Sequence, residues 1–160
     1  MADNNDHARD GSFRIKSESE MIAFGVKCAP CISPGQVIFL DGDLGAGKTT
    51  LAKGLMAGWG YTGMVTSPTF TLLESYDLSR MSVHHFDLYR MESADELEMI
   101  GARELFNSAS ICLIEWPDKA AGFLPVPDVV FTIEHCAHGR HIKIDGKTKA
   151  QLEECLQEHD

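Results

Sequence analysis

The feature that most constrains this chain is a cluster of glycines at residues 42–50, which read GDLGAGKTT. The first eight of these residues fit the pattern GxxxxGK[ST] without a gap. An apolar run at residues 36–40 precedes them with the length of a buried strand, and apolar residues at helical spacing follow as far as Gly58. The order of strand, glycine loop and helix predicts a phosphate-binding loop in an α/β domain.

Glycine suits such a loop because main-chain N–H groups must curl around phosphate oxygens, which needs unusual backbone angles and the absence of a Cβ atom. The first N–H groups of the following helix add partial positive charge at the same place. We predict that Lys48 contacts the β and γ phosphates and that the Thr49 hydroxyl ligates Mg²⁺. The predicted nucleotide contacts in the loop are Gly42, Asp43, Leu44, Gly45, Ala46, Gly47, Lys48, Thr49 and Thr50.

Two carboxylates lie at the ends of predicted strands. Asp87 ends the pattern that begins at residue 83, and Glu115 follows the apolar run at residues 111–114. Beside a phosphate loop, strand-end acids are expected to serve an Mg²⁺ ion and the attacking water. We therefore predict Lys48, Asp87 and Glu115 as catalytic residues and Thr49, Asp87 and Glu115 as metal ligands. The pattern leaves open which carboxylate ligates the ion and which orients or deprotonates the water.

Ser67 and Thr69 lie between the loop helix and the first acidic strand, where segments that respond to a nucleotide commonly lie. Their hydroxyls could reach the γ-phosphate or its metal, although an ordinary hydroxyl-capped turn has the same composition. Trp116 is a candidate for covering a base or a partner surface, and it is equally suited to a core. Three arginines are further candidates for charge stabilisation, and spacing favours none of them: Arg90, Arg103 and Arg140.

Length and composition limit the class of protein. With 160 residues, of which 44% are hydrophobic, we expect a disordered polar tail at residues 1–11 and a single domain at residues 12–160. The absence of a signal-peptide pattern and of any long apolar run predicts a soluble, cytoplasmic protein. The formal net charge of −10, with scattered basic residues, argues against autonomous nucleic-acid binding. Any RNA would therefore be held by a partner.

The five cysteines, at positions 28, 31, 112, 136 and 155, form an odd-numbered and scattered set that favours reduced thiols over a disulfide framework. Cys28 and Cys31 have CxxC spacing, which is also that of a redox pair or a zinc half-site. Because they close a helical pattern instead of opening one, we interpret both as half-buried apolar residues. The histidine-rich segment at residues 135–141 lacks a second CxxC pair, and we do not expect it to bind a metal.

The remaining pattern alternates between strands and helices. A helix capped at Ser17 should end before Pro30, a helix near residue 95 should be interrupted at Gly101, and a last amphipathic helix should begin near residue 148. Further strands are predicted at residues 12–15, 70–76, 83–88, 111–114, 128–133 and 141–144, the second and third as an antiparallel pair and the last two linked by a turn through Gly139. The predicted fold class is α/β, a P-loop NTPase-like three-layer domain whose mixed sheet contains antiparallel strands.

Read in chain order, five motifs resemble one family, the small bacterial P-loop ATPases called TsaE or YjeE. The motifs are GDLGAGKTT (42–50), TSPTFTLLESY (66–76), HFDLYR (85–90), ELEMIG (96–101) and ICLIEWPDKA (111–120). The resemblance implies ATP and Mg²⁺ as ligands, and ATP hydrolysis in support of the machinery that forms N6-threonylcarbamoyladenosine at position 37 of tRNAs. It also implies action on a TsaB–TsaD complex, in which TsaD performs the transfer and through which the tRNA is contacted indirectly.

The resemblance further implies roles for individual residues. The family's loop lysine and threonine fall on Lys48 and Thr49, its switch serine and threonine on Ser67 and Thr69, its first strand-end acid on Asp87, and its Glu–Trp pair on Glu115 and Trp116. The segments around residues 17–18 and 139–140 align with those that flank the adenine in the family. Trp116 and Gly139 therefore join Ser67 and Thr69 among the predicted nucleotide contacts.

Other classes make different demands on the sequence. A small GTPase needs NKxD and DxxG segments, and neither occurs in the chain. A P-loop kinase usually carries an arginine-rich lid, and the sequence has no such insertion. A nucleotide-dependent switch protein of another pathway overlaps with the ATPase prediction, because a slow ATPase that switches a complex is both an enzyme and a binding module. The kinase and the switch protein are kept as the alternatives.

Overall fold

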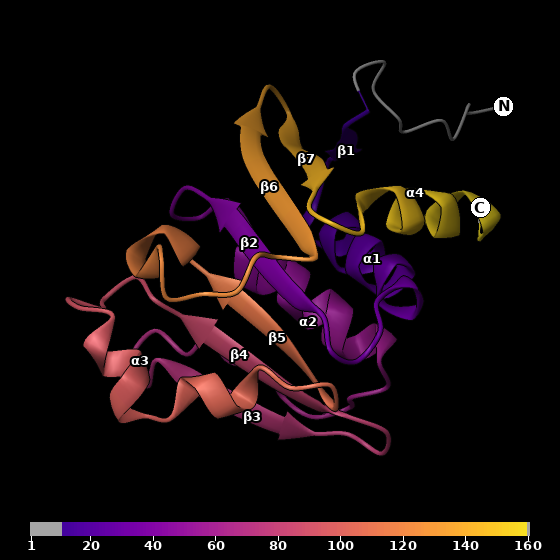
Figure 1. The fold of residues 1–160 in the computed structure, drawn as a ribbon. Helices are drawn as coiled ribbons and strands as arrows, with labels where there is room; N and C mark the ends of the chain where they lie inside the picture. Colours follow the sequence, from indigo (N-terminus) through magenta and orange to yellow (C-terminus); the bar gives the residue numbers. More distant parts are fainter. Residues whose placement is uncertain (1–10, 160) are drawn as a thin grey trace, which may run out of the picture.

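The computed structural model describes residues 11–159, which form one sheet of seven strands in the order β1-β7-β6-β2-β5-β4-β3 (Figure 1). The strands are β1 (Phe13–Ile15), β2 (Val37–Gly42), β3 (Leu73–Asp77), β4 (Ser82–Asp87), β5 (Ser110–Glu115), β6 (Val129–Cys136) and β7 (Gly139–Asp145). The helices are α1 (Glu18–Cys28), α2 (Lys48–Gly58), α3 (Asp95–Met99) and α4 (Lys149–Glu158), with short 3-10 helices η1 (Ala29–Cys31), η2 (Ala102–Leu105) and η3 (Pro117–Ala120). Apart from Gly11, the predicted tail lies outside the described residues.

The centre of the sheet is parallel and its edges are antiparallel. β2 runs parallel to β5 and β6, and β4 runs parallel to β5. β3 pairs antiparallel with β4, β7 with β6, and β1 with β7. The mixed sheet and its predicted antiparallel pair are thus confirmed. Because the carboxyl ends of parallel strands meet at one edge of a sheet, β2, β4 and β5 bring Gly42, Asp87 and Glu115 to the same edge.

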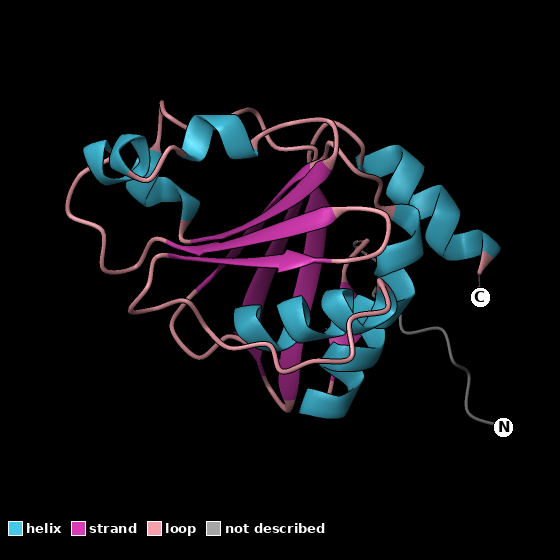
Figure 2. Ribbon diagram, turned by 90° about the horizontal axis from the view of Figure 1, so that it is seen from below, coloured by secondary structure: helices cyan, strands magenta, loops and turns pink. Residues whose placement is uncertain are grey.

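Helices cover both faces of the sheet (Figure 2). Side chains alternate between the faces along each strand, so Ile111 and Leu113 of β5 join the core beneath α1, α2 and α4. Their neighbours Cys112 and Ile114 point the other way, into a second core with α3, η2 and η3. These two apolar cores on opposite faces confirm the three-layer architecture.

The first two long helices pack closely on one face. A Cβ atom added at Gly25 of α1 would lie 2.7 Å from the main-chain nitrogen of Leu55 in α2, so only glycine permits this approach. Ser17 caps α1 as predicted, since its hydroxyl accepts a hydrogen bond from the N–H of Glu20 at 3.2 Å. The start of α1 is therefore held in a defined position beside the loop that precedes α2.

Several element boundaries differ from the prediction. β3 begins at Leu73 instead of residue 70, because Leu72 adopts a left-handed φ of 68° and its N–H donates to the carbonyl of Pro68 at 2.8 Å, which turns the chain. The β6–β7 turn lies at residues 137–138, with His138 at a φ of 66°, and Gly139 opens β7 instead of forming the turn. The predicted interruption at Gly101 is confirmed between α3 and η2.

The expectation of reduced thiols is wrong at two positions, because Cys31 and Cys155 form a disulfide. They are 124 residues apart in the sequence, and the packing of α4 against η1 and α1 brings them together. Cys28 is fully buried instead of half-buried, and burial raises the pKa of its thiol to about 12. The CxxC spacing is therefore not that of a bonded pair. None of the helices within residues 11–159 has the length and apolar character of a membrane span.

Candidate functional site

The glycine loop joins β2 to α2. Gly47 is the N-cap of α2 and has a left-handed φ of 111°, a conformation that side chains rarely adopt. Lys48 and Thr49 begin the helix, whose first N–H groups have no partner within the helix itself. The first turn of α2 contains no acidic residue that would oppose an anion. The loop thus has the backbone geometry and the charge of a phosphate site.

The Lys48 side chain lies across the loop. Its ammonium donates to the carbonyl oxygens of Gly42 and Asp43 and lies 3.7 Å from the ring centroid of Trp116. The residue is 5% exposed, and burial lowers the pKa of its ammonium, while nearby carboxylates, Glu115 the strongest, act in the opposite direction. These contacts hold the positively charged Lys48 ammonium between the loop and the end of β5.

Glu115 lies at the end of β5 and is 3% exposed. The Thr49 hydroxyl lies 3.3 Å from both of its carboxylate oxygens, and Oε2 lies 2.6 Å from Nε2 of His85. Since a carboxylate only accepts hydrogen bonds, Nε2–H of His85 is the donor. The other ring nitrogen of His85 has no hydrogen-bond partner among residues 11–159. Glu115 is therefore held between the loop hydroxyl and a buried imidazole.

Asp87 forms a second group with the predicted switch residues. Its Oδ2 accepts hydrogen bonds from the hydroxyls of Thr69 at 3.1 Å and Ser67 at 3.3 Å, and its Oδ1 accepts one from the N–H of Tyr89 at 3.0 Å. The β4–β5 register places Asp87 opposite Glu115. The two predicted acids and the predicted switch segment thus lie at one place in the fold.

Two adjoining cavities flank the loop and share Gly45, Ala46, Gly47 and Thr50. The first, about 270 Å³, is lined by Leu44, Gly45, Ala46, Gly47, Lys48, Thr49, Thr50, Ser67, Thr69, Asp87, Glu115 and Trp116. The second, about 370 Å³, lies between the start of α1 and the start of β7, and its lining includes Ser17, Glu18, Gly139 and Arg140. Most predicted site residues therefore meet in the first cavity, whereas Gly139 lines the second. Gly42 and Asp43 line neither cavity and instead hold Lys48.

The sequence analysis missed His85 and did not single out Arg140. His85 shares a strand face with Asp87, because the two residues are two positions apart in β4. This alternation could have identified His85 as a site residue from the sequence. Arg140 donates to the carbonyl oxygens of Ala46 at 3.1 Å and Gly45 at 3.3 Å, which braces the loop from β7. No spacing rule reveals that contact, because it depends on β7 lying beside the loop.

The other two candidate arginines lie elsewhere. Arg90 lies over the ring of Phe70, at 4.2 Å from its centroid. Arg103 forms an exposed ion pair with Glu98 at 2.7 Å. Neither side chain lines the two cavities beside the loop.

The donors in the first cavity have the chemistry that Mg²⁺ prefers. Thr49 offers a hydroxyl, and Asp87 and Glu115 offer carboxylates, with Thr49 and Glu115 already within 3.3 Å of each other. Mg²⁺ is a hard cation that takes oxygen ligands from one or two carboxylates, from hydroxyls and from substrate phosphates. The residues present therefore fit this ion.

A glycine loop between a parallel strand and a helix, on a mixed sheet covered on both faces, places the chain in the P-loop class of folds. The family model for threonylcarbamoyl adenosine biosynthesis protein TsaE matches residues 15–142, and the chain belongs to this family. The resemblance drawn from the sequence motifs is thus confirmed.

Individual relatives agree with this assignment. The tRNA threonylcarbamoyladenosine biosynthesis protein TsaE of Haemophilus influenzae is 42% identical over 139 residues, which cover 84% of this chain and 88% of that protein. The protein of the same name in Bacillus subtilis is 43% identical over 113 residues, or 71% of this chain and 70% of that one. The crystal structure of Bacillus subtilis YdiB superposes with a TM-score of 0.75 at 32% identity, covering 93% of this chain and 95% of that chain.

Proposed function

We propose that this chain is an Mg²⁺-dependent ATPase that acts in the cytoplasm and supports the formation of N6-threonylcarbamoyladenosine at position 37 of tRNA. The names of its relatives supply the pathway. The observation that carries the ATPase is the convergence of Lys48, Thr49, Asp87 and Glu115 on one cavity beside the glycine loop.

In this proposal the triphosphate lies against the start of α2. The N–H groups of the first helical turn and the Lys48 ammonium bind phosphate oxygens, which carry negative charge. The base and sugar occupy the second cavity, whose volume of about 370 Å³ adjoins the loop between Ser17 and Arg140. This placement agrees with the resemblance, in which these two segments flank the adenine.

The two acids take different parts in hydrolysis. Thr49, together with Glu115 or Asp87, would hold Mg²⁺, which supplies positive charge to the phosphate oxygens when bound. Glu115 is suited to orienting the attacking water, because Thr49 and His85 fix its carboxylate. Asp87 accepts hydrogen bonds from the hydroxyls of Ser67 and Thr69, so movement of this carboxylate would also move the switch segment.

We further propose TsaB–TsaD as the partner complex, with TsaD performing the transfer. The net charge of −10 suits a protein that contacts tRNA only through its partners. The alternatives remain a P-loop kinase and a nucleotide-dependent switch protein of another pathway. A kinase would move phosphate to an acceptor molecule, whereas the proposed reaction releases inorganic phosphate.

Reconstitution tests the proposal. The chain is added to TsaB, TsaD, ATP, Mg²⁺, unmodified tRNA and the activated threonylcarbamoyl donor, and both modified tRNA and inorganic phosphate are measured. We expect many turnovers per complex with the chain and arrest after about one without it or with Lys48→Ala. Equal turnover in all three mixtures would refute the proposal. Transfer of phosphate to a small acceptor molecule, instead of its release as inorganic phosphate, would favour the kinase.

A further inference from the structure

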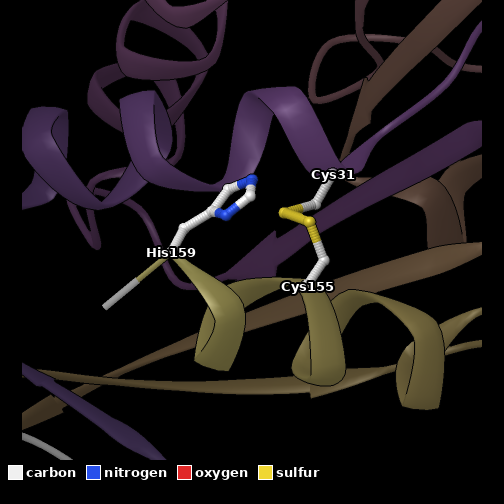
Figure 3. A group of neighbouring side chains, drawn as sticks. All are labelled: Cys31, Cys155 and His159. Carbon is white, nitrogen blue, oxygen red and sulfur yellow. A yellow bond between two sulfur atoms is a disulfide. The ribbon is translucent and has the colours of Figure 1, made fainter.

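We propose that the reduced chain binds one soft divalent cation of the zinc class through Cys31, Cys155 and His159, at a site independent of the proposed ATPase. Figure 3 shows the three side chains directed toward one another from two segments, the end of η1 and the end of α4. One ligand atom from each residue lies within 4.8 Å of the others. Among the described residues, this is the group of side chains with the proximity that a metal ion requires.

The backbone positions suit a tetrahedral ion. Cys155 and His159 are four residues apart, which places them on one side of the helix end, as in other helical ligand pairs. The Cα atoms of Cys31 and Cys155 are 5.8 Å apart. Zinc binds thiolate sulfur at about 2.3 Å, so two thiolates on one tetrahedral ion lie about 3.8 Å from each other. Rotation of the two unbonded side chains can supply this separation without movement of the backbone.

The helix α4, which carries Cys155 and ends at the residue before His159, is anchored by other contacts. Leu152 and Leu156 of α4 are 1% and 2% exposed and belong to the main core. The position of Cys155 therefore does not depend on the bond to Cys31. When the bond is reduced, both sulfurs and the imidazole remain close together, and little further chain entropy is lost on binding an ion.

The donor set selects the class of cation. Two thiolates and an imidazole are the ligands of zinc and related soft ions, and they are poor ligands for Mg²⁺. Cys31 and Cys155 are half-buried and His159 is exposed, so an ion and a reductant can reach the group and water can fill the fourth position. Cys28 lies three residues before Cys31 but is fully buried, which excludes it from the set.

The disulfide and the metal site exclude each other. A dithiol reductant transfers two electrons and two protons to the Cys31–Cys155 bond, which breaks to give two thiols while the reductant closes to its own disulfide. Binding of zinc then releases one proton from each thiol. In either state α4 is joined to η1, covalently in one and through the ion in the other.

Metal binding by the full chain tests the site. The protein is reduced, the reductant is removed under anaerobic conditions, and the protein is titrated with Co²⁺ or Zn²⁺ alone. A sample with the disulfide intact is titrated in parallel. We expect one ion per reduced chain, a sulfur-to-cobalt absorption band, and loss of both in the oxidised sample. X-ray absorption on the zinc form should show two sulfur ligands near about 2.3 Å and a nitrogen near about 2.0 Å.

Single substitutions separate this site from other thiols. Cys31→Ser and Cys155→Ser should abolish the absorption band. His159→Gln, at an exposed position, should preserve folding and weaken binding by at least about tenfold, since even outer partners of metal ligands have effects of that size. Cys136→Ser is the matched control, because this half-exposed cysteine lies in the histidine-rich segment, and it should bind like the parent chain.

Three results would overturn the proposal. The first is no uptake by reduced chain whose circular dichroism shows it folded. The second is equal uptake by the oxidised sample or by Cys155→Ser. The third is loss of binding in Cys136→Ser with retention in His159→Gln. As a further check, bound zinc should slow by at least about tenfold the reoxidation of the two thiols by a small disulfide, which forms the protein disulfide and two small thiols.

Discussion

Replacing Glu115 with glutamine tests the central residue of the proposed ATPase. Glutamine has almost the same shape as glutamate but carries no charge and cannot take up the proton of a water molecule. The side chain is 3% exposed and contacts both the Thr49 hydroxyl and His85. The amide oxygen of glutamine can still accept a hydrogen bond from either group, so the packing around residue 115 is expected to persist.

The effects on folding and on catalysis should differ in size. The substitution turns a hydrogen bond to a charged group, worth about 1.5–3 kcal/mol, into a neutral one, worth about 0.5–1.5 kcal/mol. The free energy of unfolding should therefore fall by only about 1 kcal/mol. Loss of a positioned base lowers a rate about 100- to 10,000-fold, which corresponds to roughly 3 to 5 kcal/mol of activation free energy. Hydrolysis should thus be lost from a protein that is still folded.

The assay measures released phosphate at saturating ATP and Mg²⁺, alongside urea unfolding of the same preparation. Glu134→Gln is the matched control, because this glutamate also lies in a strand but is exposed and pairs only weakly with Lys143, at 3.6 Å. It should leave both quantities unchanged. If Glu115→Gln hydrolyses ATP at the parental rate, Glu115 is not the residue that orients the water. If the free energy of unfolding falls by more than the activation free energy rises, the role of Glu115 is structural.

Four further outcomes are expected. Lys48→Ala should remove most ATP binding or turnover in calorimetry and phosphate release, and parental hydrolysis in this variant would exclude the residue from the mechanism. Gly25→Ala should lower the free energy of unfolding by about 1–3 kcal/mol in urea, although alanine normally stabilises a helix by about 1 kcal/mol, because the added Cβ would meet the backbone of α2; a rise would contradict the close packing. In the presence of a chelator, Cys155→Ser should lower the free energy of unfolding by about 2–5 kcal/mol, because it removes a crosslink between residues that are 124 positions apart. A urea midpoint equal to that of the parent chain would show that the disulfide does not contribute to stability. Burial lowers the pKa of His84 below its ordinary 6.5, so below pH 6.5 the unfolded chain binds more protons than the folded chain, and the free energy of unfolding should fall as the pH drops. His84→Gln should make the urea midpoint depend less on pH. An unchanged pH dependence in this variant would assign the effect to other groups.

Much of the fold could be predicted because its signals are local. Glycine spacing at residues 42–47 specifies a loop that side chains would obstruct, and the flanking apolar runs differ in period because one is a strand and the other a helix. The acids at 87 and 115 could be placed in the site because parallel strands end at a common edge. The boundary at Leu72 was missed because a left-handed leucine has no composition signal.

By itself, the sequence determined the loop, the two acids, the three-layer class and the family, because each depends on residues close together in the chain or on the alternation within one element. Only the tertiary structure decided which distant side chains meet. His85 of β4 contacts Glu115 of the neighbouring strand β5, Arg140 reaches the loop from β7, and Cys31 bonds to Cys155 across 124 residues. Such contacts arise from the packing of whole elements. Alternation along β4 places His85 on the same face as Asp87, but spacing within one element does not specify which distant side chain a residue meets.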